Sequence, residues 1–239
     1  MDLKSLKVKL FCDSGSLADM EEMSATGLVS GFTTNPSLVR KAGVSDYLAF
    51  CRDAAKFCGD MPLSLEVVAD DPGEIFRQAY ILQGLGDEVF VKVPVVNSSG
   101  GSNVELISDL AQEDVQVNVT ACFTEQHVKQ ARTALSRGNA NYLSYISIFS
   151  GRIADSGRCP EHLVSRAAWY VQGTGTQIIW ASVREPYNIV QAERCGCQVI
   201  TVFPEMIRRL ERFGRDLNQF AKETSKMFFD DAKAAGYSI

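Results

Sequence analysis

The stretch EVFVKVPV, residues 88–95, places one lysine inside a run of valines. A short run that is almost continuously apolar is typical of a β-strand covered on both faces. Seven more runs of this kind recur along the chain, at 8–12, 28–32, 63–68, 115–123, 142–149, 177–183 and 198–203. The sequence therefore predicts eight buried strands.

Amphipathic stretches separate these runs and predict helices between the strands. Six of them begin at a side chain that can cap a helix or at a proline suited to the first turn, namely Asp46, Asp71–Pro72, Thr124, Pro160, Pro186 and Pro204. Alternating strands and helices predict an α/β protein with a parallel sheet, and the count of eight favours a closed (β/α)8 TIM barrel. An open, doubly wound sheet is the alternative, but the first predicted strand lacks the GxGxxG pattern typical of that fold.

The chain reads as one domain. Its 239 residues fit a single barrel over 1–239, and no linker or low-complexity segment divides it. The glycine-rich stretch NSSGGSN at 97–103 is interpreted as a flexible loop, with an anion-binding nest as the alternative. An extra C-terminal helix is expected at about 215–235. Its phenylalanines and methionine need cover, either from its own barrel or from a neighbouring subunit.

Composition argues against several classes of protein. The 24 basic and 29 acidic residues give a net charge of −5, which is unlike a nucleic-acid binder. No apolar run reaches the ~18 residues of a membrane span, and the first residues lack the pattern of a signal peptide. The seven cysteines include no CxxC pair, so we expect reduced thiols in a cytoplasmic protein. With only two histidines, a metal site is not expected.

Polar side chains interrupt the predicted strands or follow them directly. In (β/α)8 barrels the C-terminal ends of the strands carry the active site. These polar residues recur about once per strand–helix repeat, so we expect them to face one mouth of the barrel. They are Asp13, Asn35, Glu66, Lys92, Asn118, Thr120, Ser147, Ser182 and Arg184.

Lys92 is the most informative of these residues, because valines flank it on both sides. Burying a charged, unpaired lysine is costly, and burial favours the neutral amine. A neutral amine inside a protein is a nucleophile towards carbonyl groups and can form a Schiff base. The alternatives are a lysine that reaches solvent at the strand end, or one paired with Glu66 or Asp13.

Asp13 and Glu66 would supply carboxylates near that amine. Schiff-base chemistry needs several proton transfers, and two carboxylates in different environments can divide them. The alternative for Asp13 is a helix N-cap for the segment that begins at Ser14.

Two arginines with a serine between them in the chain suggest a phosphate site. Arg152, Ser182 and Arg184 could bind a phosphate together. A guanidinium group can donate two parallel hydrogen bonds to two oxygens of a phosphate. The alternative is surface ion pairing with Asp155 or Glu185.

Seven motifs resemble the transaldolase family, which includes fructose 6-phosphate aldolases, in family order and over nearly the whole chain. The most specific are GFTTNPSLV at 31–39 and VFVKVPV at 89–95. The others are CDSGS at 12–16, NVTACF at 118–123, SIFSGRIAD at 147–155, ASVRE at 181–185 and GCQVITV at 196–202.

The resemblance implies a (β/α)8 barrel that carries out class I aldol chemistry on sugar phosphates without metal or cofactor. It implies Lys92 as the Schiff-base lysine and Asp13 as the acid/base for carbon–carbon cleavage. It implies that Glu66 and Thr120 position the catalytic water. The substrate-binding residues that it implies are Asn35, Asn118, Ser147, Phe149, Arg152, Ser182 and Arg184.

Two positions indicate the transaldolase branch. In the aldolases that this chain resembles, Gln stands in place of Glu66 and Tyr in place of Phe149. A tyrosine hydroxyl could help to release the three-carbon enamine, and phenylalanine lacks it. We therefore expect transfer of a dihydroxyacetone unit from a ketose phosphate to an aldose phosphate, within the pentose phosphate pathway. The alternatives are an aldolase that releases free dihydroxyacetone and a non-catalytic sugar-phosphate binder.

Two departures from the family pattern bear on the substrate. The loop at 97–103 is longer than in short family members, and Trp180 is bulkier than the usual residue. Both could reshape the pocket, which leaves a specialised relative that acts on another ketose phosphate or a sulfo-sugar as a further alternative. The resemblance also implies a homo-oligomer, either a dimer or a decamer.

Overall fold

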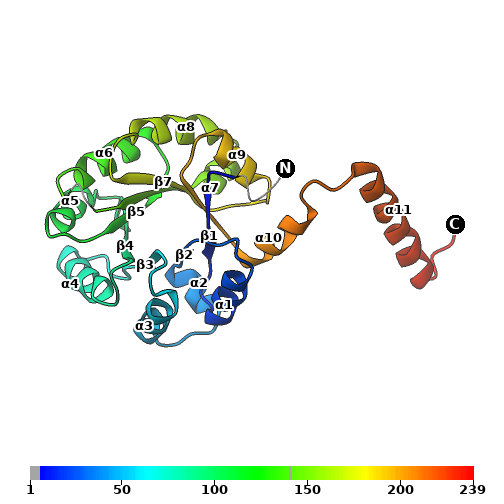
Figure 1. The fold of residues 1–239 in the computed structure, drawn as a ribbon, viewed down its shortest axis with the longest axis horizontal. Coiled ribbons are helices and arrows are strands. Elements are labelled where there is room, and N and C mark those ends of the chain that lie inside the picture. The colour runs from blue at the N-terminus through cyan, green and yellow to red at the C-terminus, as the bar shows by residue number, and fades with distance from the viewer. Residues whose placement is uncertain (1–5, 140–141) are drawn as a thin grey trace.

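Eight parallel strands close into a barrel in the computed structural model, which describes residues 6–139 and 142–239 (Figure 1). Each strand pairs with the next in sequence, and the last pairs with the first. The closed order confirms the predicted (β/α)8 barrel and rules out the open sheet. The strands are β1 (Lys9–Asp13), β2 (Phe32–Thr33), β3 (Leu63–Glu66), β4 (Val89–Pro94), β5 (Val117–Cys122), β6 (Ser144–Ile148), β7 (Thr176–Trp180) and β8 (Val199–Val202).

Helices surround the barrel on its outside (Figure 1). The caps expected at Asp46, Asp71 and Thr124 are present, and each side chain accepts a hydrogen bond from the backbone N–H three residues further on. The helices before the last are α1 (Leu17–Ala25), α2 (Pro36–Lys41), α3 (Tyr47–Cys58), α4 (Pro72–Gln83), α5 (Val104–Gln112), α6 (Glu125–Leu135), α7 (Ser150–Asp155), α8 (Glu161–Tyr170), α9 (Asn188–Arg194), α10 (Pro204–Arg208) and the 3-10 turn η2 (Arg209–Arg212).

An aromatic cluster fills the barrel at the N-terminal ends of its strands. The Tyr145 ring lies 4.6 Å from the Phe90 ring and 5.9 Å from the Phe11 ring, measured between centroids. A Cβ atom on Gly31 would lie 2.6 Å from the Phe11 ring, so glycine is needed to make room for it. Because this end is packed, any cavity in the barrel must lie at the C-terminal ends of the strands.

The second strand is shorter than the run at 28–32 predicts, because β2 spans only Phe32–Thr33. Two residues further on, Asn35 caps α2 and Pro36 occupies its first turn, so the chain leaves the sheet at once. This early exit leaves the end of β3 without a strand neighbour on that side.

The two features expected to reshape the pocket do not do so. Trp180 is 1% exposed and packs in the core outside the barrel, not in its mouth. The stretch at 97–103 forms a hydrogen-bonded turn around Asn97, whose side chain accepts the N–H groups of Ser99 and Gly101. Ser98 donates to Asp70 through both its N–H and its hydroxyl, which ties the turn to the loop after β3. None of these residues lines the cavity described below.

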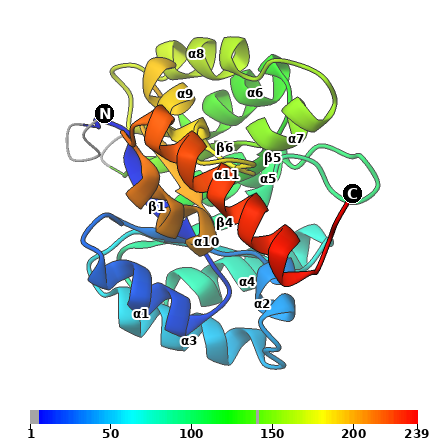
Figure 2. The same ribbon diagram turned by 90° about the vertical axis from the view of Figure 1, so that its right-hand side faces the viewer.

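The last helix, α11 (Leu217–Ala234), has no buried residue. Figure 1 shows it beyond a connecting segment, away from the other helices. In the turned view of Figure 2 it lies in front of the barrel. Met227, Phe228 and Phe229 are 50%, 63% and 68% exposed, so the interpretation that α11 covers its own barrel is wrong. In the described part of the chain, no helix is both long and apolar enough to cross a membrane.

Candidate active site

A polar cavity of about 140 Å³ opens at the C-terminal ends of the strands. Nine of the eleven predicted site residues line it, and the other two, Glu66 and Asn118, lie beside Lys92 on the neighbouring strands. The residues around the cavity are Asp13, Thr33, Asn35, Lys92, Thr120, Ser147, Phe149, Arg152, Ala181, Ser182, Arg184, Thr201 and Phe203. The structure therefore brings most of the predicted residues together at one mouth. Four residues that were not predicted also line it, namely Thr33, Ala181, Thr201 and Phe203.

Lys92 lies on β4 with only 6% of its surface exposed. Its Nζ is 2.9 Å from Oε2 of Glu66, which stands opposite it on β3, and it donates a 2.7 Å hydrogen bond to the carbonyl oxygen of Thr34. The interpretation in which the lysine reaches solvent is therefore wrong, and pairing with Glu66 is observed. Pairing offsets the cost of burial, and it places an acceptor for the lysine proton beside a nucleophilic nitrogen.

Asp13 ends β1 and faces the same cavity. Its Oδ1 accepts a 2.7 Å hydrogen bond from Thr33, whose hydroxyl is also 2.6 Å from that of Thr201. Burial raises the pKa of Asp13, while the charge of Lys92 and the Thr33 hydrogen bond act in the opposite direction. Ser16, not Asp13, caps α1, so the capping interpretation of Asp13 is wrong.

A chain of buried hydrogen bonds crosses the barrel next to Lys92. The Asn118 amide donates to Oγ of Ser64 at 3.0 Å, and Ser147 donates to Oδ1 of Asn118 at 2.8 Å. Asn118 stands opposite Lys92 in the register of β4 and β5. These hydrogen bonds link three strands to one another around Lys92. Ser64 is a member that the sequence reasoning missed, because a lone serine in a strand carries no distinctive signal.

Two other predicted residues present polar groups from the rim. Thr120 is buried, and within the described residues its hydroxyl has no hydrogen-bond partner although it lines the cavity. A buried hydroxyl of this kind can bind a water molecule or a substrate oxygen. Asn35 caps α2 by accepting the Leu38 N–H at 3.0 Å, which fixes its side chain at the cavity wall.

The two arginines line the cavity from the segments that follow β6 and β7. Arg152, on α7, has its guanidinium carbon 5.3 Å from the centroid of the Phe149 ring. Arg184 pairs with Asp155 through its Nε, 3.0 and 3.1 Å from the two carboxylate oxygens, and holds the pKa of that carboxyl below its usual range. The ion pair predicted as an alternative for Arg184 therefore forms, yet the residue still lines the cavity. Both cations can face an anionic group there.

Strained backbone surrounds this arginine side. Ser182 has a φ of +62°, in the left-handed region that non-glycine residues seldom adopt. A Cβ on Gly151 would lie 1.6 Å from the Ser182 carbonyl oxygen, so only glycine permits this approach. Ala121, directly after Thr120, also has a positive φ of +57° and lies where the β5–β6 register shifts. Strain of this kind clusters at functional sites, where the surrounding structure enforces it.

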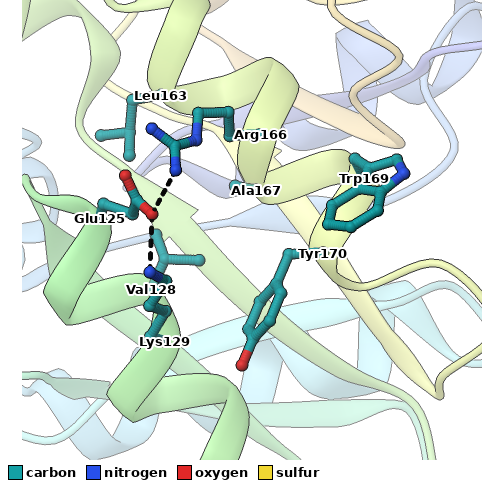
Figure 3. Close-up of a pocket in the computed structure, with 8 residues that line it drawn as sticks. All are labelled: Glu125, Val128, Lys129, Leu163, Arg166, Ala167, Trp169 and Tyr170. Carbon is teal, nitrogen blue, oxygen red and sulfur yellow. Dashed lines mark hydrogen bonds and ion pairs between the residues drawn. The ribbon is translucent and has the colours of Figure 1, made fainter.

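A separate hollow of about 260 Å³ lies on the outer wall, between α6 and α8 (Figure 3). Figure 3 shows Glu125 paired with both Lys129 and Arg166, beside the exposed rings of Trp169 and Tyr170. No predicted site residue lines this hollow, so the barrel mouth remains the candidate active site.

The cysteines contribute no nucleophile to the mouth. All seven are free, and burial raises the pKa of the Cys12 and Cys122 thiols, which keeps them protonated. In the part of the chain that the structure describes, no three His, Cys, Asp or Glu side chains gather as metal ligands.

The fold and the cavity define a (β/α)8-barrel protein in which a buried lysine pairs with a half-buried glutamate at the mouth. The chain belongs to the transaldolase/fructose-6-phosphate aldolase family, whose sequence profile matches residues 10–238.

Curated relatives support this assignment. The chain is 37% identical to a "Probable transaldolase" of Rhizorhabdus wittichii over 85% of its own length and 88% of the relative. It is 32% identical to a "Probable transaldolase" of Erythrobacter litoralis over 97% of its own length and all of the relative. A solved 2,3-dimethylmalate lyase matches with a TM-score of 0.52 at 13% identity over 98% of this chain and 86% of the other, which is a likeness of fold alone.

Proposed function

We propose that the protein is a transaldolase that transfers a dihydroxyacetone unit through a Schiff base on Lys92. The observation that carries this proposal is the ion pair of Lys92 with Glu66, in which the buried Lys92 lines a polar cavity that Asp13 also lines. A lysine that serves only structure has no need of a cavity beside it. Family membership supports an aldol reaction on sugar phosphates.

The reaction begins when Glu66 accepts the proton of Lys92 and frees its amine. The amine attacks the C2 carbonyl carbon of a ketose phosphate, and loss of water from the resulting carbinolamine gives an iminium ion. Thr120 and Glu66 hold the water that leaves here and returns at the final hydrolysis.

Carbon–carbon cleavage follows from the electron demand of the iminium. The Asp13 carboxylate takes the proton of the C4 hydroxyl, the C3–C4 bond breaks, and its electrons enter the iminium to form an enamine. The C4 carbon leaves as the aldehyde of an aldose phosphate. A second aldose phosphate then enters, and the same steps in reverse build and release a new ketose phosphate.

Phosphate recognition falls to the arginine side of the cavity. Arg152 and Arg184, with the Ser182 hydroxyl, would bind the phosphate of donor and acceptor alike. Asn35 would bind substrate hydroxyls, while Ser147 and Asn118 would hold the donor end near the lysine.

Transfer is proposed rather than release of dihydroxyacetone because of Phe149. Its ring lines the cavity under Arg152 and brings no hydroxyl that could protonate the enamine. The enamine then survives until an aldehyde arrives. Since neither Trp180 nor the loop at 97–103 reaches the cavity, we propose a common donor such as fructose 6-phosphate rather than an unusual ketose or a sulfo-sugar.

We also propose a homo-oligomer in the cytoplasm. The exposed apolar side chains of α11 find no cover on their own barrel, and a second copy of the chain would bury them. Seven unpaired cysteines suit a reducing compartment.

Borohydride reduction tests the central step. Wild-type protein is incubated with fructose 6-phosphate, reduced, digested and analysed by peptide mass spectrometry. We expect a three-carbon adduct on the peptide with Lys92 and none on the peptide with the exposed Lys129. An adduct of the whole ketose would mean binding without cleavage. If wild type gave no adduct with any ketose phosphate while binding them as well as Lys92→Ala does, the proposal would fail in favour of a non-catalytic binder.

A further inference from the structure

The end of β3 at Glu66 has lost its strand neighbour on one side. The register of β2 and β3 stops at Thr33 opposite Ser64, and the Thr34 N–H makes a last hydrogen bond of 3.0 Å to the Ser64 carbonyl. From Asn35 the chain turns into α2. The Glu66 N–H and C=O point towards the place that β2 has left, because residues 64 and 66 share one edge of the strand.

The hydroxyl of Tyr47 fills that place. It donates a 2.7 Å hydrogen bond to the Glu66 carbonyl oxygen and accepts one of 3.2 Å from the Glu66 N–H. Tyr47 is the first residue of α3, and Asp46 caps this helix by accepting the Ala49 N–H. Burial raises the pKa of the Tyr47 phenol, so it stays protonated and can donate and accept at once.

The opposite edge of β3 pairs with β4, the strand that carries Lys92. The Val67 N–H donates to the Lys92 carbonyl at 3.1 Å, and the Glu66 side chain reaches the Lys92 Nζ at 2.9 Å. Glu66 is thus the last residue of β3, and its backbone is held on its free side by one hydroxyl from another element. A cavity of about 490 Å³ lies on that free side, lined by Tyr47, Glu66 and Gln78 among others. Without the hydroxyl, water from this cavity could compete for the end of the strand.

We propose that Tyr47 is a positioning residue for the reaction: it stands in for the missing strand and fixes the backbone of Glu66, so that the carboxylate stays on Lys92. The inference rests on the proposed function, since it assigns Tyr47 to the same step as Glu66. Tyr47 does not line the cavity that holds Lys92, so its effect must pass through Glu66.

The test is Tyr47→Phe, which removes the hydroxyl and keeps the ring packed. We expect kcat to fall about tenfold with KM within about twofold, the usual size of effect when a supporting hydrogen bond is lost. We also expect faster hydrogen–deuterium exchange at the Glu66 amide. The matched control is Tyr80→Phe on α4, where an exposed tyrosine loses its hydroxyl and neither quantity should change.

A double-mutant comparison separates positioning from a general loss of stability. In a Glu66→Gln background, Tyr47→Phe should cause little further loss of kcat, because the residue through which it acts is already disabled. The proposal is overturned if Tyr47→Phe leaves kcat unchanged, if it costs as much in the Glu66→Gln background, or if exchange at Glu66 does not accelerate. A wild type that forms no borohydride adduct would instead refute the proposed function, and amide exchange would then decide alone whether Tyr47 anchors Glu66.

Discussion

The barrel mouth and α11 show opposite departures from ordinary burial. At the mouth, charged and polar groups are buried but find partners within one chain, as Lys92 does with Glu66 and Asp13 does with Thr33. Along α11, large apolar side chains are exposed, and none of the described residues buries them. The difference teaches that one copy holds the whole set of candidate catalytic groups, whereas it leaves the apolar side chains of its last helix open to another surface.

Asp13→Asn should give the largest effect on kcat, because it removes the proposed general base from the barrel mouth and leaves α11 unchanged. We expect kcat to fall about a thousandfold, the middle of the range for a lost general base. Because burial raises the pKa of Asp13, its charged form is disfavoured by folding. Its neutral replacement should therefore raise the free energy of unfolding by about 1 kcal/mol, a common trade of stability against activity. Steady-state rates and urea titrations check both effects, and a loss of stability would contradict the account.

Arg152→Ala should come next, with KM for a sugar phosphate raised about fiftyfold, since a charged hydrogen bond to phosphate is lost. The control is Arg158→Ala, an exposed arginine on the loop after α7. Initial rates against substrate concentration measure both variants. Equal KM values for the two would show that Arg152 does not hold the phosphate.

Phe149→Tyr tests why transfer is favoured over release. A hydroxyl on this ring would stand beside the cavity, so acceptor-independent release of dihydroxyacetone should rise about tenfold, within the usual range for a positioned acid. Release is measured without an aldose phosphate, and Phe123→Tyr, on the ring 5.5 Å away that does not line the cavity, serves as control. Equal release of dihydroxyacetone from both variants would show that residue 149 does not decide between transfer and release.

The pH dependence follows from the raised pKa of Asp13. Asp13 must be ionised to take the hydroxyl proton, so the acid limb of kcat should lie above pH 3.8, the ordinary value of its carboxyl. The folded chain also binds this proton more tightly than the unfolded chain. This residue's contribution to the free energy of unfolding therefore falls as pH rises from 3.8 through the folded pKa. Asp13→Asn should remove that fall, and an unchanged stability profile would contradict it.

The smallest effect on catalysis should come from α11. Phe228→Asp should shift sedimentation towards smaller species while kcat stays within about twofold, because each mouth draws on one chain. The matched control is Lys222→Asp, an exposed polar position on the same helix. If both variants sedimented like wild type, α11 would not be an assembly surface.

Most of the mouth was predictable because polar side chains mark the C-terminal ends of apolar strands, where barrel active sites lie. The orientation of Trp180 was not predictable in this way, because it depends on how inward and outward residues alternate at the end of β7. Ser182 lines the cavity, and strict alternation would point Trp180 inward with it. The left-handed backbone at Ser182 breaks the alternation, so Ala181 and Ser182 both face the mouth while Trp180 faces out.

Other parts of the site depend on contacts between distant segments. Thr33 and Thr201 meet beside Asp13 across 168 positions of sequence, and Tyr47 reaches Glu66 only because β2 ends early. No local pattern marks such residues. The exposed face of α11 was recognised as needing cover, but a periodic pattern cannot say which surface supplies it.

The most direct test of the central claim is the fate of the enamine. Wild type is loaded with fructose 6-phosphate, and erythrose 4-phosphate is added before borohydride. The account predicts that the three-carbon adduct on Lys92 disappears and a seven-carbon ketose phosphate appears in equal amount. An adduct that decays at the same rate with or without the acceptor, yielding only free dihydroxyacetone, would contradict it and assign the chain to the aldolase branch.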